Sequence, residues 1–316
     1  NYITDGVGSP AIYSTADITV NNAALTSTAS QGIVVEGKNS VTLNNVVLNA
    51  DNNKHNSDKS DYYEAVMIYQ SMSGDADTGL SKFSATGGNI ANVNGDIFFV
   101  NNTATDISLS GVDITNNGGG AFLRAAAAGW GNEGSNGGKV NLAAKAQKID
   151  GDIIVDEISS LNLYLTEGST FTGAVNPEGA SGEVYVELTG ESKWVLTGDS
   201  YITSLTCTAG SIDLNGYTLT VDGNAYLEGS SSEGSAVEIE TGNENERREG
   251  MQAPPDGGKQ PPQDGDQQPP RGDKEPPQNG EMRGPEENSE SMPGNGQPPE
   301  KPNGEPPERP DGKGAF

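Results

Sequence analysis

The chain has 316 residues, of which 32% are hydrophobic and 6% aromatic, and its net charge at pH 7 is −27. So low an apolar fraction is unusual for a compact globule, and the apolar residues must therefore be concentrated in part of the chain. The acidic excess argues against nucleic acid as a partner, the single Cys207 excludes internal disulfides, and no apolar run is long enough to span a membrane.

One pattern of apolar residues recurs along the chain. Two apolar residues stand two positions apart, and a third follows five positions later. The first two copies begin 23 residues apart, and the third and fourth begin 24 residues apart. The five copies are ITVNNAAL (18–25), VTLNNVVL (41–48), FSATGGNI (83–90), ISLSGVDI (107–114) and IDLNGYTL (212–219).

Each copy predicts a short strand followed by a turn. Residues two apart lie on one face of a strand, and the Asn-Asn, Gly-Gly, Ser-Gly or Asn-Gly pair that follows suits a tight turn. A period near 23 residues fits one coil of a parallel β-solenoid. A β-sandwich would instead need a hairpin turn about every 8 to 12 residues. We therefore expect an all-β fold, a parallel β-helix over residues 1–229.

The interval between the second and third copies is longer and contains the polar stretch NADNNKHNSDKSDYYE (49–64), which we expect to form a loop outside the coil. The loop holds Asp58 and Asp61, and the nearby SGDADTG carries Asp75 and Asp77. Carboxylates on flexible loops that contain glycine suit Ca²⁺, so these four residues form a candidate calcium site. The alternative is a solvated loop, and no other cofactor is indicated.

Candidates for catalysis are few. His55 is the only histidine, which excludes Ser-His-Asp and Cys-His catalysis and a His-based zinc site. A lyase needs a strong base, for which Arg124 in AFLRAAAAGWGNEGSNGGKVNL is the candidate. A hydrolase needs paired carboxylates, for which GDIIVDE offers Asp152 and Asp156. We expect Arg124 to pair with a carboxylate at a coil edge instead, and carboxylates alone are weak evidence on so acidic a chain.

Aromatic side chains in polar or Gly-rich text are the candidates for ligand binding, because sugars stack on exposed rings. Tyr62 and Tyr63 are adjacent, so at least one of the two should face outward. Trp130 lies in the Gly-rich segment that follows Arg124. Trp194 in ESKWVLTG is the fourth candidate, although its register on a strand is equally compatible with burial in the core.

From Val140 the strands become longer and alternate more regularly, which we interpret as further coils.

The composition changes sharply near residue 230. Sixteen of the eighteen prolines then lie beyond Ser230, amid Gly, Gln, Asp and Glu. We expect residues 230–316 to be a disordered, acidic, Pro/Gly-rich tail or linker, because such a segment has almost nothing to bury.

Three segments carry a resemblance to a known group of proteins: FLRAAAAGWGNEGSNGGKVNL, GDIIVDEISSLNLYLTEGSTFTGAV and LTGDSYITSLTCTAGSIDLNGYTLTVDG. They are similar to right-handed parallel β-helix surface proteins of gut Firmicutes, which are described as adhesin-like or carbohydrate-binding. The resemblance implies a pectate-lyase-like coil that binds polysaccharide or a host surface, in some cases with calcium. It supplies no catalytic residue.

These observations favour a non-enzymatic protein at the bacterial cell surface or outside the cell. We expect a monomer that binds polysaccharide or host or cell-surface glycans, with no nucleic-acid partner and no membrane-spanning segment. The alternative is a polysaccharide lyase or glycoside hydrolase that acts on pectin-like substrates. A purely structural spacer is the third possibility.

Overall fold

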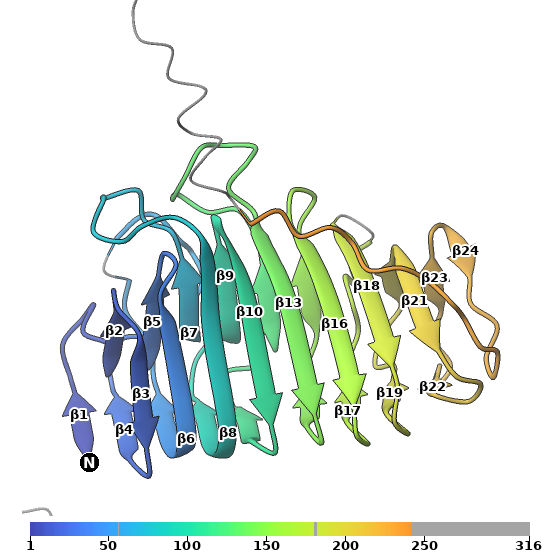
Figure 1. The fold of residues 1–316 in the computed structure, drawn as a ribbon, viewed down its shortest axis with the longest axis horizontal. Coiled ribbons are helices and arrows are strands. Elements are labelled where there is room, and N and C mark those ends of the chain that lie inside the picture. Colours follow the sequence, from blue (N-terminus) through green and yellow to red (C-terminus); the bar gives the residue numbers. More distant parts are fainter. Residues whose placement is uncertain (56, 180–181, 242–316) are drawn as a thin grey trace, which may run out of the picture. The chain divides into compact units, whose positions relative to one another are not determined.

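The computed structural model describes residues 1–55, 57–179 and 182–241, and over these residues the chain is all-β with no helix. Short strands stack in parallel to form long sheets, as in a β-helix (Figure 1). The fold class predicted from the repeat is confirmed at this level. Every strand pairing among these residues is parallel except that of the last two strands.

The largest sheet has eleven strands and is called the main sheet. In spatial order they are β1 (Tyr2–Thr4), β4 (Ala24–Ser27), β6 (Ser40–Ala50), β8 (Leu80–Asn92), β10 (Thr103–Ser110), β13 (Gly138–Lys145), β16 (Ser160–Thr166), β18 (Glu183–Leu188) and β21 (Ser204–Cys207), with β3 (Ile18–Asn21) beside β6 and β11 (Asp113–Asn116) beside β8.

Three smaller sheets complete the coils. The six-stranded sheet contains β2 (Ile12–Ser14), β5 (Ile33–Glu36), β7 (Glu64–Tyr69), β9 (Asp96–Asn101), β12 (Leu123–Ala125) and β15 (Ile153–Val155). The four-stranded sheet contains β14 (Lys148–Asp150), β17 (Thr170–Thr172), β19 (Lys193–Val195) and β22 (Ile212–Asp213). The three-stranded sheet contains β20 (Ser200–Ile202), β23 (Leu219–Val221) and the antiparallel β24 (Asn224–Ala225).

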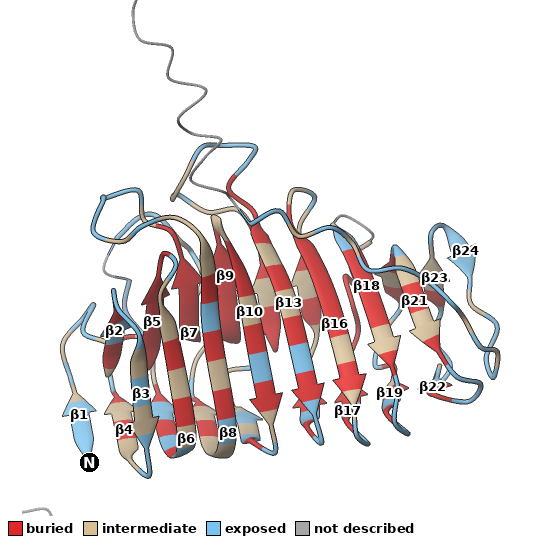
Figure 2. Ribbon diagram, viewed as in Figure 1, coloured by how far each residue is buried: buried red, intermediate tan, exposed pale blue. Residues whose placement is uncertain are grey.

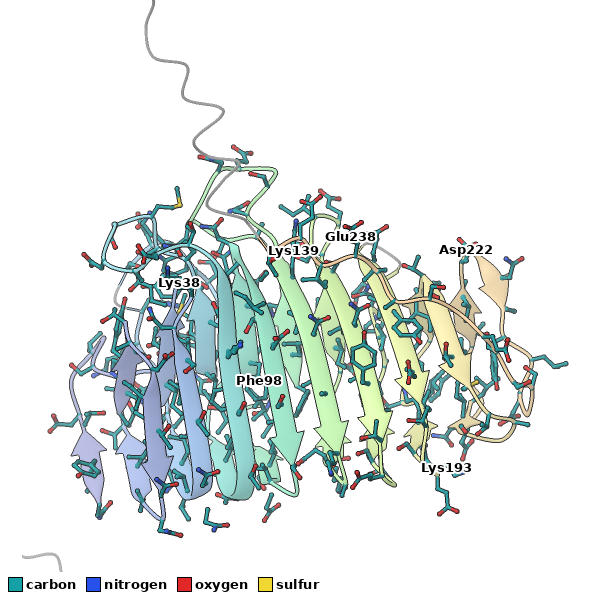
Figure 3. All side chains as sticks on the ribbon, viewed as in Figure 1. Lys38, Phe98, Lys139, Lys193, Asp222 and Glu238 are labelled. Atoms are coloured by element: carbon teal, nitrogen blue, oxygen red, sulfur yellow. The ribbon has the colours of Figure 1, made fainter. Side chains whose placement is uncertain are left out.

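The first four copies of the repeat are stacked in register. Val41 pairs with Ile18 on one side and with Phe83 on the other, and Phe83 pairs in turn with Ile107. The second apolar residues of these copies also pair with one another from coil to coil, and Leu43 in that row is buried. Buried and more exposed residues alternate along these strands (Figure 2), so one apolar row per face builds the narrow core. Phe98 from β9 reaches into this core and packs edge-on against Phe83 and Phe122 (Figure 3).

The fifth copy lies on other faces of the coil. Ile212 pairs with Trp194 in the four-stranded sheet, and Leu219 pairs with Ser200 in the three-stranded sheet. IDLNGYTL therefore does not share the register of the other four copies. Two apolar residues that stand two positions apart before an Asn-Gly pair are expected in any strand that ends at a corner of the coil. The pattern therefore does not specify which corner of the coil follows the strand.

The turn predicted within each copy of the repeat is a column of left-handed residues, which lies inside the long strands β6 and β8 and after β3 and β10. Asn22 and Asn45 have φ values of 51° and 52°, and Gly87 and Gly111 follow at the same corner of the next two coils. Glycine and asparagine enter this region most readily, which explains the Asn and Gly pairs of the repeat.

The ladder of the coil is interrupted between β11 and β14, which belong to different sheets. The buried side chain of Gln147 lies at this break. Its Oε1 accepts a hydrogen bond from the Val112 backbone N, and its Nε2 donates one to the Val112 carbonyl, both at 2.8 Å. A side-chain amide thus satisfies backbone groups that a neighbouring strand would otherwise pair.

Residues 232–241, here called the strap, cross the main sheet from β21 towards β13 (Figure 1). Ser232 and Cys207 exchange two backbone hydrogen bonds of 3.0 Å. Asn162 bonds both backbone groups of Val237, and Lys139 lies 3.5 Å from the Glu240 carboxylate. The strap belongs to the segment predicted to be a tail, and the remainder of that prediction, residues 242–316, lies outside the described residues.

Candidate functional site

The outer face of the six-stranded sheet is covered over β5, β7 and β9. All six residues of β7 and all six of β9 are buried, so both faces of these strands are packed. Residues from two loops provide the cover: residues 51–55 and 57–63 before β7, and residues 126–137 after β12. The loops contact each other, since the Lys59 Nζ donates to the Gly129 carbonyl at 3.1 Å and the Gly129 N donates to the Lys59 carbonyl at 2.6 Å.

A second apolar cluster, separate from the core of the coil, fills the space beneath these loops. Its buried members are Val34, Met67, Tyr69, Phe99 and Ala126, and the partly buried Tyr62, Ala128 and Trp130 pack against it. We call this region the covered face. Asn136 holds the second loop in place, because its Nδ2 donates to the carbonyls of Ala128 and Trp130.

Arg124 and Tyr62, both predicted from the sequence to have a role, meet on the covered face. The Arg124 Nε lies 2.6 Å from the Asp96 Oδ2, and its guanidinium stacks over the Tyr62 ring at 4.4 Å. Asp96 is buried and also accepts a 2.7 Å hydrogen bond from the Ala121 backbone N. The predicted pairing of Arg124 with a carboxylate is therefore confirmed, although Arg124 lies in the middle of β12.

Glu64 is a second buried carboxyl, and it pairs in register with Asp96 on the neighbouring strand. Its Oε1 accepts hydrogen bonds from Gln31 at 2.7 Å and from Asn52 at 3.3 Å, whereas its Oε2 has no hydrogen-bond partner. Burial raises the pKa of Glu64 to about 8; the charge of Asp96 acts in the same direction, and the hydrogen bond from Gln31 opposes both. This shift favours the protonated form of Glu64 at pH 7.

A third buried carboxyl, Glu36, accepts a hydrogen bond from the phenol of Tyr13. The Tyr13 Oη also lies 2.7 Å from the Tyr69 Oη, and burial raises the pKa of both phenols. Trp130 packs edge-on against Tyr69 with ring centroids 5.1 Å apart. The covered face therefore joins aromatic rings, hydroxyls and buried carboxyl groups.

The aromatic residues predicted to bind a ligand divide into two groups. Tyr62, Tyr63 and Trp130 are partly exposed on or beside the covered face, where Tyr63 stacks on His55 at 4.0 Å. Trp194 is 0% exposed, stacks on Phe171 at 5.3 Å and donates its Nε1 hydrogen to the Gly173 carbonyl. The prediction that Trp194 binds a ligand is wrong because its register points it inward, and the alternative of burial in the core is confirmed.

The two candidate hydrolase carboxylates accept hydrogen bonds from backbone N–H groups of neighbouring coils. The Asp152 Oδ1 accepts a 2.8 Å hydrogen bond from the Ala174 N. Asp156 accepts hydrogen bonds from the Ala127 N at 2.7 Å and from the Ser159 hydroxyl at 2.6 Å. Asp152 also lines a groove of about 760 Å³ beside the break in the ladder, together with Asp113, Lys148 and Asp150.

The four candidate calcium ligands lie in exposed loop segments. Asp58, Asp61 and Asp75 are exposed, and the Asp77 Oδ2 lies 2.9 Å from the Lys38 Nζ. Within residues 1–55, 57–179 and 182–241, no three His, Cys, Asp or Glu side chains are grouped as a metal site would require. Calcium binding by these four residues stays a prediction.

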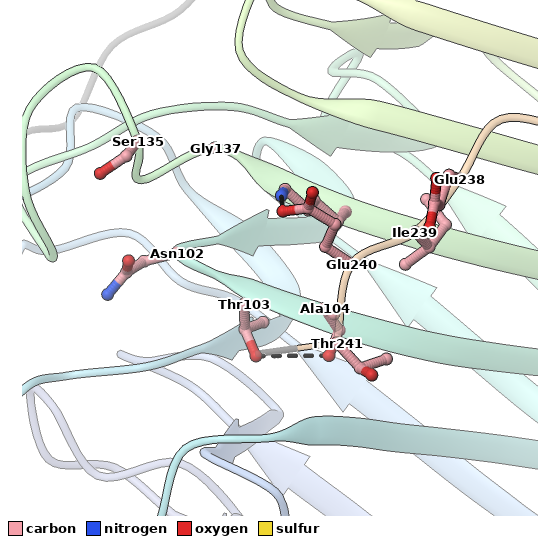
Figure 4. Close-up of a pocket in the computed structure, with 10 residues that line it drawn as sticks. Asn102, Thr103, Ala104, Ser135, Gly137, Glu238, Ile239, Glu240 and Thr241 are labelled. Atoms are coloured by element: carbon pink, nitrogen blue, oxygen red, sulfur yellow. Dashed lines mark hydrogen bonds and ion pairs between the residues drawn. The ribbon is translucent and has the colours of Figure 1, made fainter. Parts of the chain in front are cut away.

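A further pocket of about 480 Å³ lies where the strap reaches β10 and β13 (Figure 4). Backbone and small polar groups of Asn102, Thr103 and Gly137 line one side, and residues 238–241 of the strap line the other. It contains no aromatic side chain and no buried carboxyl, in contrast to the covered face.

Several residues of the covered face were missed by the sequence analysis, namely Tyr13, Gln31, Glu36, Asn52 and Asp96. A signal for two of the carboxyl groups was present. YEAVMIYQ and GDIFFVN each contain an unbroken apolar run, which is typical of strands buried on both faces. A carboxyl at the start of such a run, as in Glu64 and Asp96, is then expected to be buried.

No family model, curated protein or solved structure matches the chain. The interpretation of the site therefore depends on its geometry. No helix in the described part of the chain is long and apolar enough to cross a membrane.

Proposed function

We propose that the chain is a non-enzymatic, extracellular or surface-displayed β-helix protein that binds polysaccharide or cell-surface glycans at the covered face. One observation supports this proposal: the partly exposed Tyr62 and Trp130 line a small cavity together with Gln31 and Asn52, and the partly exposed Tyr63 is next to Tyr62 in the sequence. Sugars are recognised by stacking on aromatic rings and by hydrogen bonds to planar polar groups.

Binding is favoured over catalysis because the candidate catalytic groups already have structural partners. Arg124 neutralises Asp96, and the carboxylates of Asp152 and Asp156 bond backbone N–H groups of adjacent coils. A base or nucleophile must be free to reach the reacting atom. In keeping with the resemblance noted above, we propose a right-handed coil and a monomer, with the residues beyond the strap acting as a spacer.

The test is a glycan-binding screen of the full chain, followed by titration of the best ligand. Trp130→Ala is expected to weaken binding at least about tenfold, since an aromatic anchor is lost. Tyr217→Ala is the matched control, because Tyr217 is also an exposed aromatic residue but lies outside the covered face. Equal losses in both variants would contradict the proposed site.

The enzymatic alternative is tested by incubating the protein with pectins and xylans, with and without calcium. If the protein releases unsaturated or reducing ends and Arg124→Ala abolishes this release, the protein is a lyase and the binding proposal is contradicted. We expect no product, because Arg124 is held by Asp96.

A further inference from the structure

The outer face of the main sheet carries a group of amide and aromatic side chains where the strap crosses it. Asn141, Asn162 and Tyr185 pair in register on β13, β16 and β18. Their neighbours along each strand are buried in the core, so these three side chains point outward. Tyr164, which also points outward, packs edge-on against Tyr185 with ring centroids 5.9 Å apart. We call these four residues the main-sheet patch.

The strap covers two members of the main-sheet patch. Asn162 and Tyr185 are only 3% and 4% exposed although they point outward, whereas the other two members are partly exposed. The Asn162 amide accepts a hydrogen bond from the Val237 N and donates one to the Val237 carbonyl, both at 2.9 Å. The Tyr185 Oη donates at 2.9 Å to the Thr206 hydroxyl, which contacts both backbone groups of Gly234.

The strap is held less firmly than a strand of the coil. None of its residues 232–241 is buried (Figure 2), so it gains little from apolar contact. Beyond Ser232 it belongs to no strand, and side chains of the main sheet supply its hydrogen bonds. The exposed pair of Lys139 and Glu240 adds little, and pockets of about 480 and 530 Å³ lie between the strap and the sheet. The strap can therefore open while the coil stays folded.

The main-sheet patch has the chemistry of a glycan subsite. Tyrosine rings stack on sugar rings, and carboxamides donate to and accept from sugar hydroxyl groups. Ala143 pairs with Tyr164 on the neighbouring strand, and its small side chain leaves that side of the ring open. Asn162 now presents one donor and one acceptor to Val237. Two adjacent hydroxyl groups of a sugar would satisfy the same amide.

The charges around the main-sheet patch favour a neutral glycan. Asp106 lies at one end, where its Oδ1 accepts a 3.0 Å hydrogen bond from Asn141. Glu187 lies at the other end, where its Oε2 accepts a 2.8 Å hydrogen bond from Tyr185. These carboxylates, on a chain with a net charge of −27, would repel a polyuronate.

We propose that the main-sheet patch is a second glycan subsite, for a neutral polysaccharide, and that the strap inhibits it by bonding Asn162 and covering Tyr185. The proposal rests on the proposed function, because it extends glycan binding from the covered face to a second surface. The closed strap lowers the apparent affinity of the patch by the fraction of molecules in which the strap is open. Release of the strap therefore adds a binding site to the protein.

The experiment releases the strap and leaves the patch residues unchanged. Val237→Pro removes the N–H that Asn162 binds, and Gly234→Leu places a Cβ 2.8 Å from the Leu205 backbone N. Ala236→Pro is the matched control, because the Ala236 N makes no hydrogen bond to any described residue. Amide hydrogen exchange of the strap should become at least about tenfold faster in the two releasing variants and not in the control.

Calorimetric titration of the full-length variants with cellohexaose and xylohexaose then counts the binding sites. We expect a single site in the wild type and in Ala236→Pro, and a second site in Val237→Pro and in Gly234→Leu. Adding Tyr164→Ala to Val237→Pro should remove the second site, whereas adding Trp130→Ala should remove the site on the covered face. Oligogalacturonate, the acidic probe, should not bind to the second site.

The outcomes separate this inference from the proposed function. If strap exchange rises but no second site appears, binding at the covered face stands and this inference is overturned. A second site that is already present in the wild type, that survives Tyr164→Ala or that binds oligogalacturonate would also overturn it. If strap exchange rises in neither releasing variant, the strap is not held by these contacts and the inference fails. If no variant binds either neutral probe, both proposals are overturned.

Discussion

At the scale of single residues, the inward and outward rows of the main sheet are the feature that most directly tests the fold. Leu43 is 2% exposed and lies between Val20 and Ala85, whereas the adjacent Thr42 faces outward and is partly exposed. We expect Leu43→Asp to destabilise the protein by on the order of 4 kcal/mol, because the narrow core offers no partner for a carboxylate. Thr42→Asp should cost less than about 1 kcal/mol. Urea denaturation of the two variants measures both values, and similar losses would refute the assigned register.

Glu64 makes a second prediction at this scale. Its pKa is about 8 in the folded protein and near 4.5 in the unfolded chain, so between these values the folded state binds more protons. The stability contributed by Glu64 is therefore complete below pH 4.5 and is lost as the pH rises towards 8. Glu64→Gln cannot ionise, and its stability relative to the wild type should rise by about 2 to 3 kcal/mol between pH 5 and pH 7. An unchanged difference across that range would mean that Glu64 is ionised in the folded protein.

At the scale of elements, the strap covers the end of the main sheet at β21. Cys207 is buried, and its backbone pairs with Ser232 of the strap. A chain that ends at Ser231 should expose the edge of β21, so a thiol reagent should modify Cys207 faster, by about tenfold or more, in proportion to local opening. A chain that ends at Thr241 keeps the strap and is the control. If both chains react at the same rate, the strap does not protect this edge.

At the scale of the whole described unit, each strand up to β23 pairs in parallel only with strands of adjacent coils. Damage should therefore remain local before the coil unfolds. Leu109→Ala removes buried side-chain volume from β10, and we expect faster amide hydrogen exchange in β8 and β13, which flank it, than in β18 or β21. A uniform increase along the coil would instead indicate a single cooperative unit.

The sequence predicts the coil better than it predicts the site. The repeat is local, and Val41, Leu43 and the Asn45 corner each carry the pattern that specifies their position. The partners on the covered face come from five strands, β2, β5, β7, β9 and β12, and from the loops before β7 and after β12. Gln31 and Glu64 are 33 residues apart, and no periodicity indicates that their side chains meet. Trp194 was misassigned for a related reason, since one aromatic residue in an alternating strand does not reveal which row is inward.

The break in the ladder between β11 and β14 has a mechanical consequence. At the same level of the coil, β10 pairs with β13 and β12 pairs with β15, so two sides are joined by strand ladders. At the corner of the break, the two hydrogen bonds between Gln147 and Val112 bridge the coils. If the protein were stretched along its coil axis, the coil should bend more readily at this corner than at a level where strand ladders join every side, and the two ladders that remain would act as the hinge.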